Sequence, residues 1–140
     1  MSANFWIILA VGLILEAGLV FVLITRLKIK KDRPLKFTKK WIELQKFCAS
    51  QETWPLAVIN ADKLLDEALR RRRLKGKSMG ERMVSAQKQF SDNDRVWFAH
   101  NLAKKLTADT STKLREADVK KALIGVRQAL RDLGALTGDK

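Results

Sequence analysis

The sequence predicts an all-α protein in which one N-terminal transmembrane helix is followed by an antiparallel, up-and-down helical bundle. Three observations support this fold class. An apolar run fills about the first sixth of the 140 residues, later apolar residues recur at three- and four-residue spacing, and no alternating run is long enough for a strand. We therefore divide the chain into an N-terminal segment with the span (1–25), a basic juxtamembrane linker (26–36), a helical bundle (37–136) and a tail (137–140).

The transmembrane helix is expected from Phe5 to Thr25, a stretch of 21 residues with one ionisable side chain. At 1.5 Å per residue it is about 31 Å long, which matches a hydrocarbon core of roughly 30 Å. A cleaved signal peptide would carry basic residues before the apolar run and a small-residue cleavage site after it. Here no Lys or Arg precedes the run, whereas Arg26 and Lys28 follow it, so we expect a retained anchor.

The charges beside the span predict its direction. Six Lys or Arg residues lie within 26–36, and none lies before the span. Because basic residues favour the cytoplasmic side, we expect a single-pass protein of the cell membrane with its N-terminus outside and its bundle in the cytoplasm. The lipid bilayer is thus the first predicted partner, and Lys28, Lys30 and Lys31 are expected to meet anionic headgroups.

Glu16 is the one acid in the span and lies near its middle. An ionised carboxylate there costs about 2.5–3.5 kcal/mol on insertion scales, which favours the protonated form. Gly12 lies one turn earlier on the same face, and small residues let a second helix approach closely. We interpret Gly12 and Glu16 as a candidate surface for self-association or for pairing with another membrane helix; the alternative is a single tolerated acid.

Five bundle helices are expected, at about 34–49, 53–72, 78–88, 92–106 and 115–133. Asp32 and Pro34 favour a helix start at that point. Apolar residues of 53–72 recur every three or four positions, which predicts one buried stripe. Ser78 and Glu81 have the spacing of a capping box, and Gly134 is suited to a left-handed helix end.

Two helices carry specific expectations about burial. The apolar positions of the first are Leu35, Phe37, Trp41, Ile42, Leu44, Phe47 and Cys48, and the inward residues of the third are Met79, Met83 and Val84. The first helix has a second interpretation, in which it lies partly in the membrane interface, but packing into the bundle is favoured. The single cysteine is interpreted as a small core residue, and it excludes an intramolecular disulfide, which favours a reducing compartment.

The net charge of +13 is concentrated in two blocks. Residues 26–46 hold nine basic and two acidic residues, and residues 70–90 hold eight basic residues and one acid. The second block contains a cluster made of Arg70, Arg71, Arg72, Arg73, Lys75 and Lys77. Such a block indicates an anionic partner, either lipid headgroups or the phosphates of a nucleic acid.

Residues for catalysis are few. With one His and one Cys, no pair of these residues is available for zinc, and we expect neither a metal nor a cofactor. Asp62, Asp66 and Glu67 are expected on a solvated face of their helix, with Lys63 and the arginines after them as ion-pair partners. His100 and Arg95 are the residues that would serve a ribonuclease, as proton carrier and as phosphorane stabiliser. Five positions on a helix place them about 140° apart, so a structural role for His100 is favoured.

Several segments resemble a group of small bacterial HEPN-like helical bundles, some of them membrane-anchored. They are Ala57–Asp66, Lys75–Gly76, Met79–Glu81, Trp97–Asn101 and Leu133–Leu136, within a similarity that covers about residues 37–136. The resemblance implies a helical bundle that often acts as a dimeric, metal-independent ribonuclease through an Arg-Asn-x-x-x-His motif. In the most natural register those three positions fall on Ala103, Lys104 and Ala108, so the motif is not retained here.

Taken together, these patterns predict a non-catalytic, membrane-tethered helical interaction module. One alternative is a protein that binds RNA or another nucleic acid at the membrane through its basic cluster. A HEPN-type ribonuclease is the other.

Overall fold

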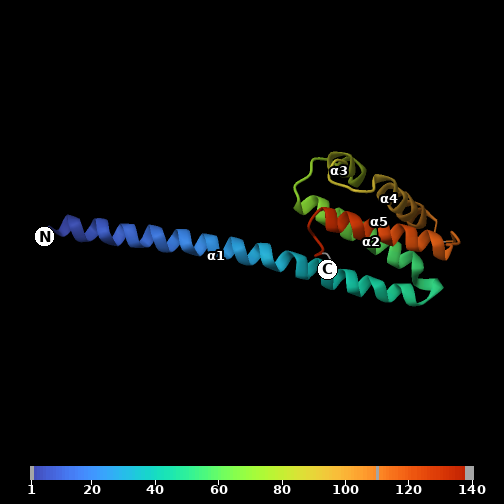
Figure 1. The fold of residues 1–140 in the computed structure, drawn as a ribbon, viewed down its shortest axis with the longest axis horizontal. Helices are drawn as coiled ribbons and strands as arrows, with labels where there is room; N and C mark the ends of the chain where they lie inside the picture. Colours follow the sequence, from blue (N-terminus) through green and yellow to red (C-terminus); the bar gives the residue numbers. More distant parts are fainter. Residues whose placement is uncertain (1, 110, 138–140) are drawn as a thin grey trace. The chain divides into compact units, whose positions relative to one another are not determined.

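The computed structural model describes residues 2–109 and 111–137, except for the side chains of residues 27–33. Over these ranges it contains helices and no strand, which confirms the all-α prediction (Figure 1). The α-helices are α1 (Ala3–Gln45), α2 (Trp54–Arg71), α3 (Met79–Ala86), α4 (Asn93–Ala108) and α5 (Glu116–Asp132). Two short 3₁₀ segments, η1 (Lys46–Ala49) and η2 (Gln51–Thr53), connect α1 to α2.

The chain divides into two units between Arg33 and Pro34. The first unit holds the apolar part of α1, a stretch of 24 residues from Ala3 to Arg26 of which none is buried. At 1.5 Å per residue this stretch is about 36 Å long, against a hydrocarbon core of roughly 30 Å. It is therefore long and apolar enough to cross a bilayer.

The start of the first bundle helix differs from the prediction. A separate helix beginning near Pro34, with Asp32 as its N-cap, was expected, but α1 runs on to Gln45 with Pro34 inside it. Proline fixes φ near the helical value, so the chain can stay helical through it, although it loses one backbone donor. Pro34 is also the first residue of the compact unit. The predicted linker of 26–36 placed the start of the bundle slightly later, at residue 37.

The second unit has its own core, built around α2. This helix packs against α3, α4 and α5, and α4 packs against α5. The end of α1 contributes Phe37, Trp41 and Leu44, so this segment packs into the bundle as favoured. Residues that are at most 1% exposed come from α2 to α5, and the largest of them are Leu65, Leu69, Met83, Leu106, Leu130, Val58, Val96 and Val126.

Local signals in the sequence account for where these helices begin and end. The Ser78 hydroxyl accepts a hydrogen bond from the Glu81 N–H at 3.2 Å, and the Glu81 carboxylate accepts one from the Lys77 N–H at 2.7 Å. Asp92 caps α4 by accepting from the Arg95 N–H at 3.0 Å. Gly134 has φ 71°, the left-handed value expected after α5.

Four side chains at predicted apolar or inward positions are not buried. Leu35, Ile42 and Val84 are exposed, and Cys48 is half-buried. Val84 points outward because α3 buries Arg82, Met83 and Ala86, a face that Val84 does not share. Cys48 lies in η1, where the α-helical spacing used to predict its burial no longer applies.

Candidate functional site

The basic cluster, Arg70–Arg73 with Lys75 and Lys77, occupies the end of α2 and the loop that follows. Its first two arginines form the last helical turn, where positive charge complements the helix dipole. Arg73 leaves the helix with φ 55°, and the next N–H, that of Leu74, donates to the Leu69 carbonyl at 3.2 Å. All six side chains are exposed.

The buried side chain of Arg82 fixes the loop that follows α2. This side chain, in α3, is 7% exposed and donates to the Asp66 carboxylate at 2.6 and 2.9 Å. It also donates to the Gly76 carbonyl at 3.0 Å. Gly76 has φ 154°, and a Cβ there would lie 2.6 Å from the Arg82 nitrogen, so a side chain would not fit. The loop that carries the lysines is therefore fixed by a hydrogen-bonded ion pair.

Positive charge exceeds negative charge in the cluster. The two arginines of the last helical turn each pair with a carboxylate one turn earlier, at 3.0 and 3.1 Å. Arg72 donates to the neutral Gln89 amide at 3.2 Å. Among the residues with described side chains, no carboxylate pairs with the side chain of Arg72, Arg73, Lys75 or Lys77. As far as the described side chains show, an external anion would meet these four cations without a competing carboxylate.

The cluster lies at the end of the bundle where α1 enters it. The Arg71 guanidinium lies 5.3 Å from the centroid of the Phe37 ring, three residues after Pro34. Lys40 donates a hydrogen bond to Glu67 from the same stretch of α1. This bond holds the pKa of Glu67 below its ordinary value of 4.5, so the ion pair is present at neutral pH. The part of the first basic block around Phe37 and Lys40 thus lies beside the last two turns of α2.

The three other lysines predicted to meet anions, Lys28, Lys30 and Lys31, belong to α1, but their side chains lie outside the described part of the structure. Contact of these lysines with an anionic surface stays a prediction.

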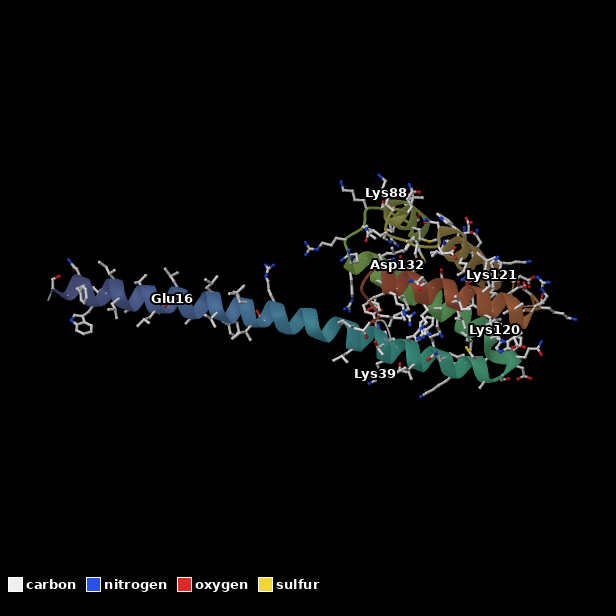
Figure 2. The ribbon with its side chains drawn as sticks, viewed as in Figure 1. Glu16, Lys39, Lys88, Lys120, Lys121 and Asp132 are labelled. Atoms are coloured by element: carbon white, nitrogen blue, oxygen red, sulfur yellow. The ribbon has the colours of Figure 1, made fainter. Side chains whose placement is uncertain are left out.

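Gly12 and Glu16 lie on the apolar stretch of α1, and both are exposed (Figure 2). No neighbouring atom lies within 4 Å of a Cβ built at Gly12. The structure contains one chain, so association of this face with a second helix also stays a prediction.

His100 pairs with Asp62, which differs from the solvated position expected for that carboxylate. The His100 Nδ1 atom lies 3.0 and 3.2 Å from the two Asp62 oxygens, and both side chains are largely buried, at 11% and 15% exposure. Burial raises the pKa of Asp62, although the hydrogen bond from His100 opposes the rise. The pair joins α4 to α2. No nucleophilic side chain is hydrogen-bonded to the ring among the described residues.

Arg95 does not join His100. Its side chain is exposed and pairs with Asp92 at 3.3 Å in the first turn of α4. The two residues that would serve a ribonuclease therefore have separate partners, as their spacing on one helix predicts. Across the described residues, no group of three or more His, Cys, Asp and Glu could hold a metal ion.

A cavity between α1 and α2 has a volume of about 270 Å³. The ion pair of Lys40 with Glu67 lines it, together with Glu43, Leu44, Phe47, Asn60, Lys63 and Leu64. Ligand pockets usually measure about 300–1,000 Å³ and are mostly apolar, so this small, charged cavity is a poor small-molecule site.

Sequence reasoning missed the two buried polar pairs, Arg82 with Asp66 and His100 with Asp62. A signal for the first was present, since Arg82 stands between Met79, Met83 and Ala86 on the apolar face of a short helix. A charged residue at such a position needs a buried partner. Which of the acids on α2 supplies it depends on the packing of α3, which spacing alone does not give.

Comparison with known proteins adds no relative: no family model, no curated protein and no solved structure matches the chain.

Proposed function

We propose that this chain is a non-catalytic, membrane-tethered interaction module that holds a helical bundle against an anionic surface on the cytoplasmic side. The apolar helix Ala3–Arg26 would serve as the tether and the bundle as the module. The resemblance to HEPN-like bundles without the nuclease motif fits this proposal. Membership of that family is itself a proposal, and so is the location at the membrane.

The observation that carries the proposal is the position of four cations that no described carboxylate pairs with. Arg72, Arg73, Lys75 and Lys77 follow Arg71, whose guanidinium lies 5.3 Å from the Phe37 ring, and Phe37 comes only about ten residues after the apolar helix. An anionic bilayer attracts each Lys or Arg near its surface by about 1 kcal/mol. A cluster at this position therefore favours lipid headgroups, which the tether keeps close by.

Nucleic acid is the competing partner for the same charges. Proteins that bind single strands without sequence preference combine a basic groove with aromatic side chains on which bases stack. In the described part of the bundle, the exposed large apolar residues are Leu35, Ile42, Leu56, Val84 and Ile124, all of them aliphatic. Lipid is therefore the favoured partner.

Binding of the fragment 34–140 to vesicles tests the proposal, because the buried core lies wholly within this fragment. We expect it to sediment with phosphatidylglycerol vesicles and to stay in solution with phosphatidylcholine vesicles. Replacing Arg73, Lys75 and Lys77 by Gln should weaken binding on the order of 100-fold, from about 1 kcal/mol for each charge.

The matched control replaces three exposed lysines elsewhere, Lys104, Lys113 and Lys120, and changes the net charge equally. Equal loss in both triple variants would mean that only net charge matters and would contradict a directed surface. Salt-sensitive binding of the fragment to single-stranded RNA, without binding to vesicles, would favour the nucleic-acid function instead.

A further inference from the structure

The side of α1 that faces away from the bundle carries an apolar and basic stripe. Leu35, Lys39 and Ile42 lie on it, with Lys46 one turn further on in η1, and all four are exposed. Leu35, Lys39 and Ile42 follow one another by four and three residues, which places them on one face of α1. Lys46 comes directly after the helix, at the first position of η1. Figure 2 shows Lys39 on the side of α1 away from α2 and α5.

Two of the four side chains in this stripe are large, aliphatic and exposed. Leu35 is 65% exposed and Ile42 is 54% exposed, the two highest values among the large apolar residues described in the compact unit. The opposite face of the same segment already supplies Phe37, Trp41 and Leu44 to the core. The stripe is therefore a second face with apolar side chains, and it does not contribute to the buried core of the bundle.

We infer that the stripe Leu35–Lys39–Ile42–Lys46 contacts the headgroup region of an anionic bilayer. Two aliphatic side chains would enter the boundary between headgroups and acyl chains, and the two lysines would extend to the phosphates. Such an alternation of aliphatic and basic residues is typical of helices that lie at a membrane interface. The inference rests on the anchoring part of the proposed function.

The chain lengths agree with this occupant. Leu35 follows Arg26, the end of the apolar stretch, by nine residues, which span about 14 Å as a helix and at most about 32 Å when extended. The headgroup layer extends only about 5–8 Å beyond the hydrocarbon core, so a straight helix would carry Leu35 past it. The stripe reaches this layer when the chain turns between Arg26 and Leu35.

A second copy of the chain fits the stripe less well. Two copies facing each other through this side would bring Lys39 and Lys46 against the same lysines of the other copy, which is unfavourable. A stable protein interface also uses about 20–30 residues a side, whereas the stripe offers four. Charge complementarity therefore favours lipid.

Spin labels on the full-length protein in phosphatidylglycerol vesicles test the inference. Cys48→Ser removes the native thiol, and single cysteines then replace Leu35 or Ile42. The matched controls are cysteines at Leu56 and Ile124, which are 46% and 53% exposed on α2 and α5. Collision rates with oxygen and with a water-soluble nickel complex report the depth of each label.

We expect labels at 35 and 42 to collide several-fold less with the nickel complex, and more with oxygen, than labels at 56 and 124. Equal rates at all four positions would overturn the inference. A fifth label, at Ile14, reports the anchor itself: if it is buried in lipid while 35 and 42 resemble the controls, only the inference fails, and if it is not, the proposed function fails as well.

Charge reversal gives a second measurement that does not touch the labelled positions. Lys39→Glu with Lys46→Glu should raise the nickel collision rate of the label at 42 toward that of the label at 124. Lys104→Glu with Lys113→Glu, an equal change of charge elsewhere, should leave it unaltered. If both double variants shift the label alike, the lysines of the stripe have no local role. Circular dichroism shows whether each variant keeps its helices.

Discussion

Replacing Arg82 by Met should destabilise the bundle more than replacing any exposed arginine. The Arg82 side chain is 7% exposed and pairs with Asp66, which is 19% exposed. Methionine keeps most of the volume but leaves the carboxylate without this partner. Removing one member of a buried ion pair costs about 3–5 kcal/mol, because the remaining charge stays partly desolvated. Since Asp66 also keeps Arg70 at 3.0 Å, we expect a loss near the lower end, about 3 kcal/mol.

The assay is urea unfolding of the fragment 34–140, followed by circular dichroism. Arg70→Met is the matched control, because Arg70 contacts the same carboxylate but is 66% exposed. An exposed ion pair contributes about 0–1 kcal/mol, so this variant should remain close to the wild type. The reasoning is wrong if Arg82→Met costs no more than Arg70→Met.

A double-mutant cycle identifies the interaction. Asp66→Asn alone leaves a buried guanidinium without its carboxylate and should also cost a few kcal/mol. The double variant, Asp66→Asn with Arg82→Met, should cost less than the two single losses together, because residues in contact are not additive. Additive losses would mean that the two side chains stabilise the bundle independently.

Further predictions concern two glycines and the buried carboxylate. Gly125→Ala should cost about 1–3 kcal/mol, because its Cβ would lie 2.8 Å from the Cβ and the carbonyl oxygen of Arg95. At Gly134 an added Cβ meets no atom within 4 Å, but φ is 71°, so Gly134→Ala should cost roughly 1–2 kcal/mol through backbone strain alone. Urea unfolding measures the free energy lost in each variant. A neutral result would contradict the steric contact at Gly125 or the backbone strain at Gly134. Burial raises the pKa of Asp62 above 3.8, so between 3.8 and its raised value the native state binds more protons than the unfolded state. The free energy of unfolding should therefore fall as pH rises through that interval, and Asp62→Asn should lose this part of the slope; identical pH profiles for both proteins would contradict it.

The sequence determined the helices well wherever a repeated pattern met a clear boundary signal. The stripe of 53–72 became α2, the Ser78–Glu81 box opened α3, and Gly134 took its left-handed conformation after α5. These features depend on residues within one or two turns of each other, which is the range over which spacing and capping act.

The features that the sequence did not predict depend on contacts between helices. Asp62 was placed in solvent because its neighbours on α2 are charged, and only the packing of α4 brings His100 against it. Pro34 matched a helix start equally well, since a first turn and a helix interior use the same φ. Leu35 and Ile42 are apolar positions of the predicted first helix, but α1 has one face in the bundle and these two lie on the other.

For the candidate site, the composition identified the basic residues but not which of them pair with carboxylates. The run Arg70–Arg73 reads as four equivalent charges. In the structure the first two pair with carboxylates one turn earlier, and the last two, with Lys75 and Lys77, do not. Part of that difference is visible in the spacing, because Asp66 and Glu67 lie four residues before Arg70 and Arg71, whereas Ala68 and Leu69 lie four residues before the other two arginines.

The span of the core, from Phe37 to Leu136, sets an order of events during synthesis. About 100 residues separate these two side chains, and at about 5–20 residues per second they take roughly 5–20 s to be made. The apolar helix Ala3–Arg26 is complete eleven residues, or roughly 0.5–2 s, before that interval begins. In a chain anchored as proposed, insertion therefore precedes folding. A variant that folds slowly would wait at the bilayer surface with its apolar helix faces open to lipid, and it would not diffuse away into the cytoplasm.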